Sequence, residues 1–122
     1  MNVDQPLAIE CISAITLCTA NMALALAFYR VLGFSLIYGD DDSSFASLAA
    51  GVSYVNLTVQ PPPSFWGRVI FHVADVDAVY RRAVAAGFTP LTTPADASWG
   101  ERYFHLRDPD GNELSFARPL AR

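Results

Sequence analysis

The sequence predicts an α+β fold in which two βαβββ modules form a half-open trough of mostly antiparallel sheet, with the helices outside. Three features of the sequence predict this fold: a β-hairpin near the end of the chain, a repeated strand–helix–Gly-Phe pattern, and a proline-rich boundary between the two copies. The hairpin turn is Asp108-Pro109-Asp110-Gly111-Asn112, with alternating apolar residues on both sides. Pro109 fixes φ at a value suited to a turn, and Gly111 can adopt a positive φ. Such a hairpin needs further strands to cover one of its faces.

An internal repeat places this hairpin at the end of a second module. A strand at 12–18 precedes a helix at 22–32, which Asn21 caps and Gly33-Phe34 ends. The same order recurs as a strand at 68–73, the cap Asp75, a helix at 76–86 and Gly87-Phe88. The distance from cap to glycine is the same in both copies, which favours a true repeat over a coincidence between two unrelated helices.

The remaining strands complete each copy and suggest the domain organisation. The first copy adds strands at 35–38, 45–49 and 53–59; the second adds 89–92, a loop at 94–98, and the hairpin strands 102–106 and 113–117. Three prolines at 61–63 stop regular pairing between the copies. We therefore expect a single domain over 1–122, with one module at 11–60, a linker at 61–64 and a second module at 65–118.

Composition and charge exclude several classes of protein. Of the 122 residues, 52% are hydrophobic and 16% charged, which predicts a globular domain rather than a disordered chain. The 8 basic residues are all arginine, are outnumbered by 12 acidic ones and form no run, which argues against nucleic-acid binding. Charge, Gly and Pro break every apolar stretch well short of a membrane span. The N-terminus lacks the pattern of a signal peptide, so we expect a cytoplasmic protein.

Strand alternation predicts which side chains face the trough. In 12–18, Ile15 and Leu17 suit the side packed on the helix, which leaves Ala14 and Thr16 facing the trough. The facing of strand 102–106 stays open, because both of its sides carry aromatic residues. Opposite charges on one face, and aromatic residues with no other cover, favour a pocket over a merely solvated sheet face. The candidate ligand-binding residues are Phe45, Tyr54, Asn56, Arg68, His72, Trp99, Arg102, Phe104, Glu113 and Ser115.

Three stretches resemble the vicinal oxygen chelate superfamily and together cover nearly the whole chain. They read ISAITLCTANMALALAFYRVLGF, RVIFHVADVDAVYRRAVAAGF and SWGERYFHLRDPDGNELSF. The last is the most specific, and its WG-x-R-x-F-x-x-RDPDGN form is similar to the bleomycin-resistance branch and its glyoxalase-like relatives. The superfamily also includes glyoxalase I, extradiol dioxygenases and fosfomycin-resistance enzymes.

The resemblance implies four metal-ligand positions, and the residues found there do not suit a metal. The superfamily's enzymes use His, Gln or Glu on the end strands of each module; the corresponding residues here are Ala14, Asn56, Arg68 and Ser115. Alanine has no donor atom, arginine carries a fixed positive charge, and the other two offer weak neutral oxygens. A substitute pair of His72 and Glu113 would hold a metal poorly. We therefore predict no metal and no other cofactor.

These observations favour a protein that binds a small aromatic or amphipathic molecule in the trough without metal, as bleomycin-resistance proteins sequester their drug. Aromatic stacking would hold the ligand, and Arg68, Asn56 and Glu113 would orient it. The alternative is a metal-dependent lyase or dioxygenase of the same superfamily, and a third possibility is a metal-free enzyme with His72 as general base beside Glu113. An enzyme is the less favoured class. The resemblance also implies a homodimer, and the trough could be completed within one chain or across the two chains.

Overall fold

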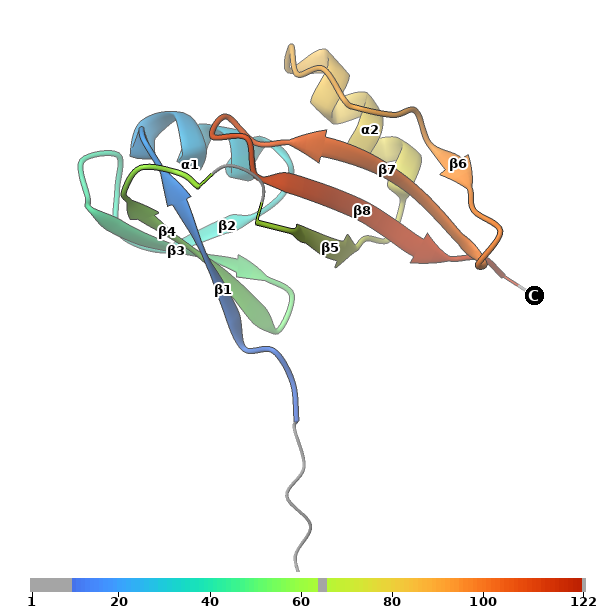
Figure 1. The fold of residues 1–122 in the computed structure, drawn as a ribbon, viewed down its shortest axis with the longest axis horizontal. Coiled ribbons are helices and arrows are strands. Elements are labelled where there is room, and N and C mark those ends of the chain that lie inside the picture. The colour runs from blue at the N-terminus through green and yellow to red at the C-terminus, as the bar shows by residue number, and fades with distance from the viewer. Residues whose placement is uncertain (1–9, 64–65, 122) are drawn as a thin grey trace, which may run out of the picture.

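Two four-stranded sheets and two helices make up the described chain (Figure 1). The structure is a computed structural model and describes residues 10–63 and 66–121. The first sheet contains β1 (Ala14–Thr19), β2 (Ser35–Tyr38), β3 (Phe45–Ala50) and β4 (Ser53–Val59), and α1 (Met22–Val31) follows β1. The second contains β5 (Arg68–His72), β6 (Ala95–Asp96), β7 (Glu101–Arg107) and β8 (Glu113–Pro119), and α2 (Val76–Ala85) follows β5. The predicted α+β fold of two βαβββ modules is confirmed.

The two sheets have the same topology. Their strand orders are β1-β4-β3-β2 and β5-β8-β7-β6, and in each the first pair is parallel and the others antiparallel. β1 and β5 are therefore edge strands of their sheets. The two sheets lie side by side in Figure 1. The expected linker at 61–64 falls between β4 and β5, and its residue 64, like residues 1–9 of the expected domain, lies outside the described residues. The proposed domain boundaries stay a prediction.

The two helices begin and end in the same way, as the repeat predicts. The side chains of Asn21 and Asp75 accept hydrogen bonds from the third backbone N–H that follows each, at Leu24 and Ala78. At the end of α1, Gly33 adopts a φ of +108°, and the N–H of Phe34 donates to the carbonyl of Tyr29 at 3.1 Å. Only glycine adopts this φ without strain, so the residue stops the helix and turns the chain into β2.

The core lies between the sheets and the helices. Alternation along β1 and β4 buries Leu17, Val55 and Leu57 and leaves Thr16 and Tyr54 on the opposite, exposed face. In the second sheet, Leu114 and Phe116 of β8 are buried. Aromatic contacts join the halves: the rings of Phe34 and Phe71 are 5.1 Å apart, and Phe71 stacks on Phe116 at 5.6 Å. The two modules therefore share one core, and each sheet keeps one face free of helices.

The β7–β8 turn, residues 108–112, ties the second module to the first. The Tyr29 hydroxyl of α1 donates to the buried Asp108 carboxylate at 2.7 Å, and the backbone N–H of Ala20 donates to Asp110 at 2.7 Å. Asn112 reaches the Cys18 carbonyl at 3.3 Å. Gly111 has the positive φ that the turn requires, at +84°. The hairpin turn is therefore also a contact between modules, which we call the turn clasp.

Burial and charge shift the pKa values of two groups in the turn clasp, the Tyr29 hydroxyl and the Asp108 carboxyl. Burial raises the pKa of the Tyr29 hydroxyl well above its ordinary value, and the neighbouring Asp108 charge adds to the rise. Burial also raises the pKa of Asp108, although hydrogen bonds from Asn112, Tyr29 and Asp110 oppose the rise. The clasp thus holds a carboxyl whose cost of burial exceeds the stabilisation that its hydrogen bonds give to the charged form.

One predicted strand is wrong. Residues 89–92 form no strand, and the short β6 instead lies within the predicted loop at 94–98, where Ala95 pairs with Tyr103. Pro90 and Pro94 lack the N–H that a ladder needs. Two isolated hydrogen bonds replace the ladder. The N–H of Leu91 donates to the His105 carbonyl at 2.8 Å, and the Thr92 hydroxyl accepts from the His105 N–H at 3.0 Å.

Neither helix is a candidate membrane span. Each has 10 residues, and no helix among the described residues is long and apolar enough to cross a bilayer.

Candidate functional site

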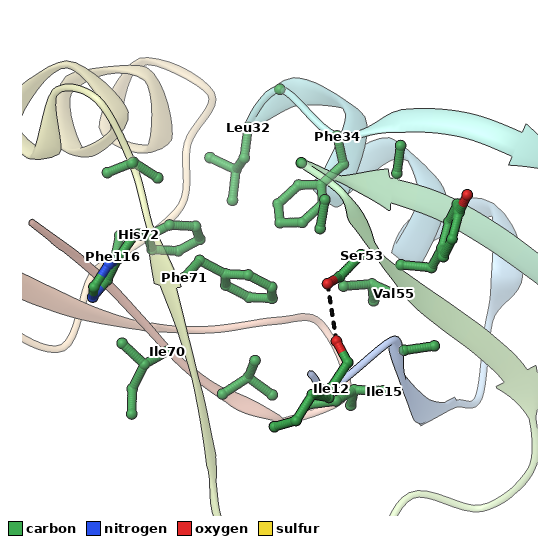
Figure 2. A pocket seen from close by; sticks show the side chains of 18 residues that line it. Ile12, Ile15, Leu32, Phe34, Ser53, Val55, Ile70, Phe71, His72 and Phe116 are labelled. Atoms are coloured by element: carbon green, nitrogen blue, oxygen red, sulfur yellow. Dashed lines mark hydrogen bonds between the residues drawn. The ribbon is translucent and has the colours of Figure 1, made fainter. Parts of the chain in front are cut away.

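An apolar pocket of about 400 Å³ lies between the edge strands β1 and β5. Figure 2 shows Phe71 and Ile70 of β5 on one side and Ile12, Ile15 and Ser53 on the other. The complete lining is Ile12, Ala14, Ile15, Leu32, Gly33, Phe34, Ala49, Ala50, Gly51, Ser53, Tyr54, Val55, Val69, Ile70, Phe71, His72, Val73 and Phe116. We call this the interstrand pocket. Its size and apolar lining suit a small molecule.

Few polar groups reach the interstrand pocket, and they lie at its border. The Ser53 hydroxyl already donates to the Ile12 carbonyl at 2.9 Å, as the dashed line in Figure 2 shows. Tyr54 and His72, two predicted site residues, are exposed at the border and belong to opposite modules. Among the side chains that line the pocket, only those of Ser53, Tyr54 and His72 are polar.

The exposed face of the second sheet continues from the pocket border at β5. Backbone register sets its residues in three cross-strand rows over β5, β8 and β7. The rows are Arg68–Glu113–Arg107, Ile70–Ser115–His105 and His72–Ala117–Tyr103. The small residues of β8 in the middle, Ser115 and Ala117, are buried between larger neighbours on both sides. We call this surface the second-sheet face.

Charged residues occupy one end of the second-sheet face. The Nε of Arg68 donates to the Glu113 carboxylate at 2.6 Å, so the opposite charges expected on one face do form a pair. Arg107 is the other cross-strand neighbour of Glu113, and it forms no ion pair within residues 10–63 and 66–121. This end therefore carries two positive charges against one negative.

The other end of the second-sheet face is acidic and aromatic. His72 lies 3.4 Å from Glu101, and the Trp99 indole N–H donates to the same carboxylate at 3.0 Å. Trp99 is 68% exposed and its ring lies 5.6 Å from that of Tyr103. His72 therefore has Glu101 as its carboxylate neighbour, whereas Glu113, expected beside it, is paired with Arg68.

The first sheet contributes three predicted residues on its exposed face. Asn56 of β4 donates weakly to the Thr16 hydroxyl at 3.4 Å, and Tyr54 is 45% exposed one row along. Phe45 lies at the start of β3, exposed, with its ring 6.4 Å from that of Tyr38. Of these three, only Tyr54 lines the interstrand pocket.

Two predicted site residues lie on the opposite face of β7. Phe104 is fully buried between α2 and β8, where its ring contacts Tyr80 and Phe116. Arg102 donates to both carboxylate oxygens of Asp77 on α2, each at 2.9 Å, and this bond lowers the pKa of Asp77. Their expected place in the trough is therefore wrong: the helix covers this side of β7, which leaves Tyr103 and His105 on the second-sheet face.

The glyoxalase family model, which describes the glyoxalase/bleomycin resistance protein/dioxygenase superfamily, matches residues 12–116. The chain belongs to this superfamily. An uncharacterized protein of Mycolicibacterium smegmatis is 33% identical over 113 residues, 91% of this chain and 96% of the relative. An uncharacterized protein of Mycobacterium bovis is 33% identical over 96 residues, 77% of this chain. The chain spans only 58% of that relative and 52% of two from Mycobacterium tuberculosis.

Solved structures share the fold. TioX from Micromonospora sp. ML1 is 28% identical, with a TM-score of 0.76 over 91% of this chain and 100% of that one. A bleomycin resistance determinant encoded on the transposon Tn5 is 20% identical, with a TM-score of 0.76 over 92% of this chain and 100% of that one. At that identity the second comparison supports the fold alone.

The residues at the superfamily's metal positions do not fit a divalent cation. Arg68 holds a positive charge there and already pairs with Glu113 at 2.6 Å. Ala14 has no donor atom, and Ser115 is buried in the middle of the second-sheet face. No group of three or more His, Cys, Asp or Glu residues in the described part of the chain is placed to hold a metal ion. The donor set therefore opposes a metal at these positions.

Sequence reasoning missed most of the interstrand pocket. Its lining combines both faces of β1 and β5, because side chains from either face of an edge strand border the gap between two sheets. The turn after α1 adds Gly33 and Phe34, which the sequence marked only as a helix end. Strand alternation assigns a residue to one face or the other, so it gives no signal for a pocket at a sheet edge.

Proposed function

We propose that this superfamily member binds a small aromatic or amphipathic molecule without metal, in the interstrand pocket and along the adjoining second-sheet face. The observation that carries the proposal is the position of the apolar pocket, which opens between the exposed Tyr54 and His72 and beside a charged sheet face. Apolar walls with few polar side chains suit a ligand that has a flat apolar body and a polar end.

The chemistry of the metal positions supports a binding role without metal. A lyase or dioxygenase of this superfamily would need a divalent cation beside Arg68, where a fixed positive charge opposes it. Elemental analysis of protein purified without chelator provides the test. A stoichiometric divalent metal would overturn this part of the proposal and favour the enzyme alternative.

Sequestration of an antibiotic is the specific form of binding that we propose, and the superfamily includes bleomycin resistance proteins. A homodimer would suit this role, because exposed apolar residues lie on both free sheet faces. Tyr38 and Tyr54 of the first sheet are 64% and 45% exposed, and Ile70 of the second is 57% exposed. A second copy would cover them. Light scattering that shows a monomer at micromolar concentration would remove the dimer from the proposal. The cytoplasmic location is a separate prediction, which cell fractionation can test.

Calorimetry and Trp fluorescence with bleomycin, and dye fluorescence with anilinonaphthalene sulfonate, test the binding role. Ala49 lines the interstrand pocket, so Ala49→Phe fills part of it and should weaken binding at least about tenfold. Ala95→Phe adds the same side chain at an exposed position on β6, outside the pocket lining, and should change affinity less than about twofold. If neither probe gives heat or a fluorescence change, the proposed function is refuted. If Ala49→Phe and Ala95→Phe weaken binding equally, the ligand binds elsewhere than in the interstrand pocket.

A further inference from the structure

His105 lies at the centre of the second-sheet face and has no assigned role. Its Cα partner is Ser115 of β8, which in turn pairs with Ile70 of β5 at the border of the interstrand pocket. The buried side chains of Phe104 and Leu106 on either side of it fix its orientation, because alternate residues of a strand point to opposite faces. A ligand that extends from the pocket across β8 would therefore reach the imidazole.

The imidazole of His105 has no hydrogen bond to the described residues, and its Nδ1 is buried. Burial is the main cause that lowers its pKa; the Arg68 charge adds to the fall, and Glu113 opposes it. A neutral imidazole carries a single N–H, and a buried N–H without a partner is costly. This cost favours the proton on Nε2, which leaves His105 with one unused donor.

The charges that face His105 favour an acceptor with negative charge. In the next row, Arg68 and Arg107 flank Glu113, and Arg107 forms no ion pair with the residues described. The ring of Tyr103 lies 5.0 Å from that of His105. His72 and Glu101 lie beyond it at the far end of the face. An anionic oxygen over Ser115 would therefore meet one donor from His105 and one unpaired guanidinium.

We propose that His105 and Arg107 bind the carboxylate or phenolate oxygen of an aromatic ligand, whose ring lies over Ile70 and the border of the interstrand pocket. This inference rests on the proposed function and narrows its ligand to aromatic anions. Two donors of this kind form charge-assisted hydrogen bonds with a carboxylate, about twice as strong as neutral ones. A cationic or neutral ring of the same shape would lose them.

The chain has only 2 histidines, so NMR can follow His105 directly. The spectrum of His72→Gln assigns the His105 imidazole, and the wild-type protein is then titrated with benzoate, benzamide and benzamidine. Benzoate should shift the His105 nitrogen resonances and raise the pKa of its imidazole. Benzamide and benzamidine should shift them far less at the same concentration. Equal shifts with all three probes would overturn the inference.

Arginine variants on the two faces of the same sheet provide the matched control. Arg107→Gln removes the guanidinium two residues along β7 from His105, in the next row of the same face, whereas Arg118→Gln makes the same change in net charge at an exposed position on the helix side of β8. Benzoate affinity should fall about tenfold in the first variant and less than twofold in the second. An equal fall would show that benzoate responds only to net charge. Binding of benzamide without the benzoate effects would overturn this inference and leave the proposed function standing, whereas no binding of any aromatic probe, bleomycin included, would refute both.

Discussion

Loss of the Tyr29 hydroxyl should measurably weaken the turn clasp. In Tyr29→Phe the ring still fills its place in the core, and only the 2.7 Å bond to Asp108 is removed. A hydrogen bond to a charged group contributes about 1.5–3 kcal/mol. Asp108 keeps bonds from the backbone N–H groups of Asp110 and Asn112 and from the Asn112 side chain, so the remaining carboxylate is not orphaned. We therefore expect the lower part of that range, a loss of about 1.5–2 kcal/mol.

Urea unfolding followed by circular dichroism measures this loss as a change in midpoint at constant slope. Tyr80→Phe is the matched control, because its ring packs on Phe104 in the core and its hydroxyl forms no hydrogen bond within the described part of the chain. The control should differ from wild type by less than about 0.5 kcal/mol. If the two variants lose equal stability, the Tyr29–Asp108 bond does not stabilise the fold.

The pH dependence of the clasp has a definite sign. Burial raises the folded-state pKa of Asp108 above its ordinary value of 3.8, so in the interval just above 3.8 the folded protein binds more protons than the unfolded chain. Stability from this group is then fully present below 3.8 and falls as pH rises through the folded pKa. The wild-type protein should lose stability relative to Asp108→Asn over this interval. A relative gain would mean that hydrogen bonds to the carboxylate outweigh its burial.

The remaining predictions concern caps, core and surface. Asn21→Ala and Asp75→Ala should each lower the free energy of unfolding by about 1 kcal/mol, measured in urea. The caps are on separate helices, so the two losses should add in the double variant, and a double-variant loss far from their sum would contradict independent caps. Phe104→Ala should cost about 3–5 kcal/mol, far more than Tyr103→Ala on the free face, and a reversed order would place β7 the other way round. Arg102→Gln removes the bond that lowers the pKa of Asp77 below its ordinary value of 3.8. The variant should therefore be less stable than wild type above pH 3.8 in thermal unfolding, and the difference should shrink as the pH falls below that value. A difference that grows on acidification would contradict this sign.

The sequence predicted the fold well because local signals were duplicated. Asn21 and Asp75 cap their helices with the same geometry, and a turn of known chemistry sits between β7 and β8. The facing of β7 could not be predicted in this way. Both of its sides carry aromatic residues, and only the position of α2 decides that Phe104 is covered and Tyr103 is not. The strand predicted at 89–92 failed for a local reason: threonines beside Pro90 and Pro94 have strand propensity, but the prolines lack the N–H donors that a ladder needs.

The site was less predictable than the fold because it depends on how two modules are joined. Alternation along one strand correctly placed Arg68 and Glu113 on one face, but it says nothing of a gap between sheets. That gap is bordered on one side by Phe71 of β5 and on another by Phe34, the residue after the helix-ending glycine. The turn clasp joins the same two modules at the C-terminal end of β7, through the hydrogen bond between Tyr29 and Asp108. The residues that set the width of the interstrand pocket are therefore core and turn residues, which a search for exposed polar side chains passes over.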